Sequence, residues 1–340
     1  MTVDPEADVA ATAPINPERL LSLVHPELRE SAAAMIAAPK VSFDAASLAA
    51  ARQGWPVPPE HPATVAPVLR RAIPGAEGHA LGVEIIGQVT PGAARPAIVH
   101  MHGGGMVSGR AAHGTPYCQE LAAHFDAIVV NVDYRRAPET PYPGPADDTL
   151  AAWRWLVGQA DALGVDTSRI ALSGVSAGGG HAAILALRLA EIRGQQPCAL
   201  VLIYPMLDDR TGSTAHPAWP IGTFGWTGQA NAFGWSAFLG TPAGSAQVPT
   251  GAVPARAERL EGLPPTFIGV GSLDLFVEEN IAFARGLVRA GAPVALDVVP
   301  GAYHAFDFVV PDSRVSQRFR AGWQDWLARV FAAPKQERAA

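Results

Sequence analysis

The chain has 340 residues, of which 49% are hydrophobic, so it can bury a large core in one α/β domain or in a domain with an inserted lid. Lysine and arginine total 25 against 31 aspartate and glutamate residues, which gives a net charge of -6. No basic cluster interleaved with aromatic residues occurs, so we expect no nucleic-acid partner. A small disulfide-bonded scaffold is excluded by the length and by the presence of only 2 cysteines.

The cysteines favour a reducing compartment, and the N-terminal run does not resemble a signal peptide. Cys118 lies in an expected helix and Cys198 at the start of an apolar strand, where buried free thiols are the ordinary interpretation. The N-terminal run carries Asp4, Glu6 and Asp8 instead of the positive charges of a signal peptide, and no apolar run has the length of a membrane span. We expect a cytoplasmic protein that does not associate with a membrane.

Residues 1–60 are rich in Ala and Pro and contain two weakly amphipathic stretches, around Pro17 to Ala37 and around Phe43 to Gln53. We expect short helices there. Because no strand precedes them, they should pack onto the main domain from outside, as an arm or as part of a lid.

Beyond residue 80, short β-branched runs bounded by Gly, Pro or charged residues alternate with helical segments. The expected strands are 82–90, 97–101, 127–134, one around Ile170, 199–204, 266–270 and 294–299, and the expected helices are 147–163, the one after Ser176, 278–290 and 313–331. Apolar strands that alternate with helices predict an α/β fold with a mostly parallel sheet covered by helices on both faces.

The interval from Pro205 to about Pro254 interrupts the alternation. It mixes Gly and Pro with several aromatic residues, among them Trp219, Phe224 and Trp226. Such an insertion forms either an ordinary hydrophobic subcore or the roof of an apolar substrate pocket. We take these three aromatic residues as candidate substrate-binding residues. The expected division is 1–60 N-terminal cap or arm helices, 61–204 first part of the catalytic domain, 205–254 cap insertion and 255–340 second part of the catalytic domain.

The strand around Ile170 ends in Gly174-Val175-Ser176-Ala177-Gly178, a G-x-S-x-G pattern that leads into a helix. Small flanking residues let the backbone bend sharply and expose the serine hydroxyl above the sheet. The pattern also occurs by chance, and glycines after a strand can cradle a phosphate, but no dinucleotide fingerprint follows a strand here. Ser176 is therefore the candidate nucleophile, and it requires a histidine base and a group that orients this base.

The strand 97–101 runs into His102-Gly103-Gly104-Gly105. Consecutive glycines cost conformational entropy and pack poorly in a strand, so they indicate a loop whose N–H groups approach a ligand closely. In acyl transfer this ligand is the oxyanion. We predict an oxyanion hole formed by the amides of Gly104, Gly105 and Ala177; a simple flexible turn is the alternative.

The candidate base and acid follow from position in the sheet, because ligands of open α/β sheets meet the carboxyl ends of strands. His304 comes shortly after the strand 294–299, and Asp274 comes shortly after the strand 266–270. The chain order Ser176, Asp274, His304 is also that of α/β-hydrolases. These three residues are the predicted catalytic triad.

Two further histidines are possible metal ligands. His100 and His102 alternate in the strand 97–101, but no third ligand of suitable spacing accompanies them. We expect no metal and no cofactor.

Several motifs beyond residue 80 occur together in one known family. They are His102-Gly-Gly-Gly105, Asp133-Tyr-Arg-Arg-Ala-Pro-Glu139, Gly174-Val-Ser-Ala-Gly-Gly179, Asp274-Leu275 and His304-Ala-Phe306. In these motifs the chain resembles the hormone-sensitive-lipase-like (family IV) carboxylesterases of the α/β-hydrolase superfamily. The resemblance implies an α/β-hydrolase fold with a helical cap, the same triad and the same oxyanion hole.

The chain departs from the family pattern in three places. Family members usually have Asp or Thr where this chain has Val175, and glycine where it has Ala305. The acid loop reads Asp-Leu-Phe-Val-Glu-Glu in place of Asp-Pro-Leu-Arg-Asp-Glu. None of these changes removes a catalytic atom.

The resemblance and the residues together predict a carboxylesterase of the EC 3.1.1 type that cleaves small-molecule esters with short to medium acyl chains through an acyl-enzyme. An amidase or lactonase on the same triad is an alternative. A non-catalytic small-molecule-binding member of the fold is another, which the retained His304 disfavours. The resemblance suggests both monomers and homodimers, with dimers often joined through the last strand, here residues 294–299.

Overall fold

The computed structural model describes residues 16–38 and 43–334. Its centre is an 8-stranded sheet with the strand order β1-β2-β4-β3-β5-β6-β7-β8. The strands are β1 (Val68–Pro74), β2 (Ala80–Ile86), β3 (Arg95–Met101), β4 (Ile128–Asp133), β5 (Val165–Val175), β6 (Ala199–Ile203), β7 (Thr266–Gly271) and β8 (Val294–Val299). β2 pairs antiparallel with β1 and β4, and all other neighbours are parallel. The predicted mostly parallel sheet is confirmed.

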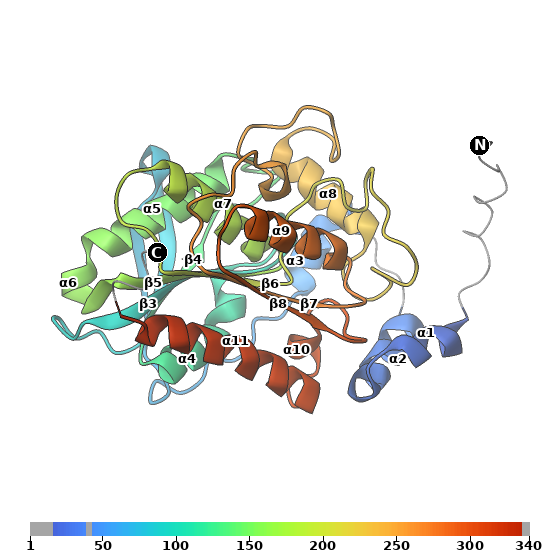
Figure 1. The fold of residues 1–340 in the computed structure, drawn as a ribbon, viewed down its shortest axis with the longest axis horizontal. Coiled ribbons are helices and arrows are strands. Elements are labelled where there is room, and N and C mark those ends of the chain that lie inside the picture. The colour runs from blue at the N-terminus through green and yellow to red at the C-terminus, as the bar shows by residue number, and fades with distance from the viewer. Residues whose placement is uncertain (1–15, 39–42, 335–340) are drawn as a thin grey trace.

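Helices cover both faces of this sheet (Figure 1). The longer ones are α4 (Ala111–Phe125), α5 (Gly144–Gly158), α7 (Ala177–Glu191), α8 (Gly228–Leu239), α9 (Val277–Arg289) and α11 (Arg314–Ala332), and the short ones are α1 (Pro17–Leu23), η3 (Pro26–Leu28), α2 (Arg29–Ala37), α3 (Leu48–Gly54), η4 (Ala76–Gly78), α6 (Ala160–Leu163), η5 (Pro254–Arg256) and α10 (Phe306–Val309). α4 and α11 lie on one face, and α5, α7 and α9 lie on the other.

The central strands are apolar on both faces because both faces are covered. In β3, Ile98 belongs to the core under α4 and α11, whereas its neighbour Val99 belongs to the core under α5 and α7. Successive side chains of a strand point to opposite faces, so a strand between two helical layers has a continuous apolar sequence. This is the pattern from which the strand was predicted.

The edge strand β1 was not predicted from the sequence. It contains Arg70 and Arg71, and most of its residues are exposed. The strand forms because it pairs with β2 along its whole length. An edge strand of this kind has no apolar face long enough to produce a recognisable period.

The N-terminal helices pack against the C-terminal half of the chain. Leu20 and Leu28 are buried in the same hydrophobic core as Phe306, and the His25 N–H donates to the Gly301 carbonyl at 2.9 Å. Helices were predicted in this region, and the structure has them at α1, α2 and α3. Residues 1–15 and 39–42 of the predicted arm lie outside the described residues.

The segment from 205 to 254 contains one α-helix, α8. Trp235 and Phe238 of this helix are completely buried, and they share a hydrophobic cluster with Leu48 of α3. The insertion and the N-terminal segment are therefore packed together, as is expected if both belong to one cap.

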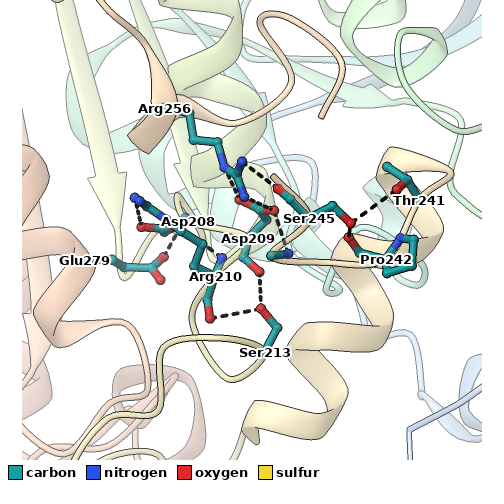
Figure 2. A network of polar contacts seen from close by, with 10 residues as sticks. Asp208, Asp209, Arg210, Ser213, Thr241, Pro242, Ser245, Arg256 and Glu279 are labelled. Carbon is teal, nitrogen blue, oxygen red and sulfur yellow. Dashed lines mark hydrogen bonds and ion pairs between the residues drawn. The ribbon is translucent and has the colours of Figure 1, made fainter. Parts of the chain in front are cut away.

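A buried polar network ties both ends of this segment to the main domain (Figure 2). Asp209 is fully buried and accepts hydrogen bonds from Arg256 Nε at 2.7 Å and Nη2 at 2.8 Å. Arg256 Nη1 also donates to the Ser245 carbonyl at 2.8 Å. On the other side, Glu279 of α9 accepts from the Leu207 N–H at 2.6 Å. The buried carboxylate of Asp209 is tolerated because it is paired with the Arg256 guanidinium.

Candidate active site

Ser176 lies in the sharp turn between β5 and α7. Its φ of 57° and ψ of -122° are values that a residue with a side chain rarely adopts. The turn depends on glycine at both sides. A Cβ at Gly174 would lie 2.1 Å from the Gly178 carbonyl oxygen, and a Cβ at Gly178 would lie 2.0 Å from that of Met101. The spacing of the two glycines in the sequence thus reflects a close approach of three backbone segments.

The three residues predicted as a triad form one hydrogen-bonded chain. Ser176 Oγ lies 3.0 Å from His304 Nε2, and His304 Nδ1 lies 2.8 Å from Asp274 Oδ2. With the imidazole proton on Nδ1, the serine hydroxyl donates to Nε2 and Nδ1–H donates to the carboxylate. Asp274 is fully buried, and its other oxygen accepts from the Phe276 N–H at 2.9 Å. The carboxylate is thus held in one orientation by the acid loop.

Two aromatic rings pack against the imidazole of His304. Tyr204, which follows β6, and Phe276 both meet it edge to face, at ring-centroid distances of 4.8 and 5.2 Å. Ala305 has a φ of 60°. This conformation accounts for the glycine that is usual there in the family, because only glycine adopts it without steric cost.

The glycine loop after β3 lies directly beside Ser176. A Cβ at Gly103 would lie 3.4 Å from the Cβ of Ser176. Gly104 and Gly105 have φ values of 133° and 61°. A Cβ at Gly104 would lie 2.1 Å from the Ser108 carbonyl oxygen, and one at Gly105 would lie 2.2 Å from the Trp226 ring.

The predicted oxyanion donors also have free N–H groups. In residues 16–38 and 43–334, no backbone acceptor takes the N–H of Gly104, Gly105 or Ala177. Ala177 is the first residue of the 15-residue helix α7, and the first N–H groups of a helix have no partner within it.

Ser176 and His304 open into a cavity of about 500 Å³. Its wall is formed by the N-terminal segment, β3, α4, α10 and the loops that follow β6 and precede α8. The aromatic and histidine side chains of this wall include Phe43, Trp55, His100, Tyr117, Tyr204, Trp226 and Phe308. Most of this lining is apolar, which suits the carbon skeleton of an organic ester.

Of the three aromatic residues predicted to bind substrate, only Trp226 lines this cavity. Its ring meets Phe43 edge to face at 5.1 Å, and its Nε1 donates to Asn231 Oδ1 at 3.1 Å. Trp219 is instead 45% exposed, with the Arg19 guanidinium 5.0 Å from its ring. Phe224 is buried against Tyr303. The sequence shows that this segment carries aromatic residues, but it does not show which of them line the cavity.

The histidines of β3 and of the glycine loop are neutral groups of the cavity wall. Burial lowers the pKa of His100 to about 3 and that of His102 to about 4. His102 stacks on Tyr134 at 4.2 Å, and its Nδ1 lies 2.8 Å from the Gly103 carbonyl oxygen. The His102 side chain thus forms a hydrogen bond with the backbone of the glycine loop.

Two kinds of feature are absent from the described residues. No group of at least 3 His, Cys, Asp or Glu side chains in that part of the chain is placed to hold a metal ion. None of the described helices is both long and apolar enough to cross a membrane.

The chain is similar to known proteins in both sequence and structure. Residues 98–308 match the sequence profile of a family described as having the alpha/beta hydrolase fold. Ethyl acetate hydrolase of Pseudomonas putida is 36% identical over 238 residues, which are 68% of this chain and 72% of that protein. Carboxylesterase NlhH of Mycobacterium tuberculosis is 37% identical over 236 residues, which are 64% of this chain and 69% of that protein.

A solved structure extends the likeness over nearly the whole chain. A bacterial heroin esterase superimposes with a TM-score of 0.80 at 31% identity, and the match covers 92% of this chain and 99% of the other. The chain therefore belongs to the hormone-sensitive-lipase-like family of the α/β-hydrolase fold. Within this family it is a carboxylesterase.

Proposed function

We propose that this carboxylesterase hydrolyses esters with short to medium acyl chains through an acyl-enzyme, with Ser176 as nucleophile, His304 as general base and acid, and Asp274 as orienting carboxylate. The observation that carries the proposal is the chain of hydrogen bonds from Ser176 Oγ through the imidazole to Asp274 Oδ2, at 3.0 and 2.8 Å, at the wall of an apolar cavity. Ethyl acetate hydrolase, a relative, has a short acyl ester in its name.

In the first half of the reaction, Ser176 Oγ attacks the ester carbonyl carbon while its proton passes to His304 Nε2. The buried carboxylate of Asp274 stabilises the imidazolium that forms. The negative charge on the former carbonyl oxygen is stabilised by the amides of Gly104, Gly105 and Ala177, and loss of one such donor typically costs about 2.7–4 kcal/mol. The tetrahedral intermediate then collapses, and the alcohol leaves with the proton of His304 Nε2.

In the second half, water takes the place of the alcohol. His304 Nε2 removes a proton from the water as it attacks the acyl carbon, and the same amides stabilise the second oxyanion. The second intermediate releases the carboxylic acid, and the proton on Nε2 returns to Ser176 Oγ. The enzyme is thereby restored with no net change in its protonation.

The cap in this proposal consists of residues 1–60 and 205–254. Phe43 and Trp226, one from each segment, meet at 5.1 Å and form an apolar wall of the cavity. The cavity volume of about 500 Å³ lies within the range of about 300–1,000 Å³ for small-molecule sites. This size supports short to medium acyl chains.

The test is the turnover of p-nitrophenyl esters of increasing acyl length by the wild type and by Ser176→Ala. We expect the wild type to show an optimum at one chain length and Ser176→Ala to lose roughly 10⁴-fold or more in kcat. Ser22→Ala, which removes a hydroxyl bonded to the Arg19 carbonyl in α1, is the matched control. Undiminished turnover by Ser176→Ala would contradict the mechanism.

A further inference from the structure

One wall of the cavity carries polar side chains that the proposed mechanism does not use. We call His100 of β3, Tyr117 of α4 and Tyr204 after β6 the polar wall. All three line the cavity with Ser176, and they are 2%, 9% and 0% exposed. The rings of His100 and Tyr117 lie 5.3 Å apart. Three buried polar residues from separate elements thus face one space.

Two groups of the polar wall lack hydrogen-bond partners. His100 Nδ1 lies 3.4 Å from Ser173 Oγ, but no hydrogen bond within residues 16–38 and 43–334 involves His100 Nε2 or the Tyr117 hydroxyl. Neither atom is among the fully buried side-chain atoms of these residues that lack a partner. Tyr204 differs, because its hydroxyl donates to Asp307 Oδ1 at 2.9 Å. His100 Nε2 and the Tyr117 hydroxyl therefore reach the open space of the cavity. A molecule that fills the cavity without bonding to them would leave two polar groups buried and unpaired, which costs free energy.

The charge of the polar wall defines the group that it can bind. Burial keeps the His100 imidazole neutral, with a pKa lowered to about 3, and raises the pKa of the Tyr117 hydroxyl. No Lys, Arg, Asp or Glu is among the described residues that line the cavity. The nearby Asp307 carboxylate, which raises the pKa of Tyr117, disfavours an anion. The polar wall therefore fits an uncharged group.

Both unpartnered groups can act as donors. The Tyr117 hydroxyl donates through O–H, and His100 donates through Nε2–H when the Ser173 hydroxyl donates to Nδ1. A carbonyl oxygen has two lone pairs and accepts from both at once. An alkyl group at the same place would leave both donors unpaired.

We propose that the polar wall is a subsite for an uncharged acceptor oxygen of the substrate, so that the enzyme prefers esters with a keto group several bonds from the ester linkage over alkyl esters of the same shape. This inference rests on the proposed function, since it names the substrate class of the same cavity. The keto group is carried by the acid part or the alcohol part of the ester, and the chemistry at the polar wall is the same in both.

The test compares two isosteric pairs of esters by kcat/KM, each divided by its rate of alkaline hydrolysis. The acid pair is p-nitrophenyl 4-oxopentanoate and 4-methylpentanoate, and the alcohol pair is 4-oxopentyl and 4-methylpentyl acetate. We expect a preference of about 3- to 10-fold for the keto ester in at least one pair, as hydrogen bonds between neutral groups supply. The pair that shows it identifies the part of the substrate at the polar wall.

Three variants separate the subsite from general effects on activity. Tyr117→Phe removes only the hydroxyl and is expected to abolish most of the preference for the keto ester. Gly114→Ala is expected to lower it too, because the added Cβ would lie 3.8 Å from His100 Nε2 and cover it without a clash. Tyr142→Phe is the control. Its hydroxyl donates to the Thr250 carbonyl away from the cavity, so the preference should not change.

Equal rates for both members of both pairs, or a preference that Tyr117→Phe leaves intact, would overturn the subsite. In that case the alkyl esters are still cleaved, and the esterase mechanism stands. If the wild type cleaves none of the four esters and Ser176→Ala behaves like it, the proposed function itself fails. The two failures are therefore distinguished in one set of assays.

Discussion

Arg256→Met tests whether the network in Figure 2 holds the insertion to the main domain. The substitution keeps a long side chain but removes both hydrogen bonds from the guanidinium to Asp209, at 2.7 and 2.8 Å. Asp209 is fully buried, and among the described residues its carboxylate would keep only the Gly244 N–H, 2.8 Å from its Oδ2. An uncompensated buried carboxylate is the expected result.

Removing one partner of a buried ion pair typically costs about 3–5 kcal/mol. The Arg256 side chain is itself 20% exposed, so water reaches the pair and we expect the lower end, about 3 kcal/mol. Urea unfolding followed by circular dichroism gives this value from the shift in midpoint at constant slope. A changed slope would show that the insertion unfolds separately from the sheet.

Two controls make the result specific to the buried pair. Arg210→Met removes an ion pair in which Arg210 is 47% exposed, and it should cost no more than about 1 kcal/mol. Asp209→Leu combined with Arg256→Met removes both charges and should cost less than Arg256→Met alone. The reasoning is refuted if Arg256→Met costs no more than Arg210→Met, or if the double variant is the least stable.

Three further substitutions address the site. Asp274→Asn should lower kcat by about 10⁴-fold in ester turnover, because the amide favours the wrong imidazole tautomer; a loss below about tenfold would argue against its orienting role. Ala305→Gly should raise the free energy of unfolding by up to about 1 kcal/mol, since Ala305 has a φ of 60°; a destabilised variant would speak against strain there. Burial raises the pKa of Asp307 to about 6 from 3.8, so the native state binds its proton more tightly than the unfolded chain and wild-type stability falls as pH rises through this interval. Asp307→Asn does not lose stability in this way, and its side-chain oxygen still accepts from Tyr204. Its free energy of unfolding relative to the wild type, measured with urea, should therefore increase between about pH 4 and pH 6. A difference that does not vary with pH would show that the pKa of Asp307 is not raised.

The hydrogen-bonded arrangement of Ser176, Asp274 and His304 could be predicted because each residue follows a strand. Ser176, Asp274 and His304 come after β5, β7 and β8, whose carboxyl ends meet at one edge of the sheet. The periodic and apolar patterns that reveal these strands are local in the sequence. Position along the chain was therefore enough to bring the three residues together.

The cavity wall could not be predicted in the same way. Whether Trp219, Phe224 or Trp226 faces the substrate depends on how the insertion packs on Phe43 and α3, and no local pattern records this packing. Tyr204 was overlooked because it continues the apolar run of β6 and has no motif of its own.

The buried polar network could not be predicted either, because its partners are far apart in the sequence. Asp209 and Arg256 are 47 positions apart, and isolated charges in Gly- and Pro-rich segments are ordinarily solvated. The sequence shows each charge, but only the fold shows that they meet in a buried site.

The most direct test of the central claim is covalent labelling of the wild type with a serine-directed alkyl phosphonate, followed by peptide mass spectrometry. The account predicts one phosphonyl group per chain, attached to Ser176, and loss of ester turnover in proportion to labelling. His304→Ala should slow the labelling strongly, because Ser176 then lacks its base. A fully inactivated enzyme with the label on another residue, or labelling of Ser176 that leaves turnover unchanged, would contradict it.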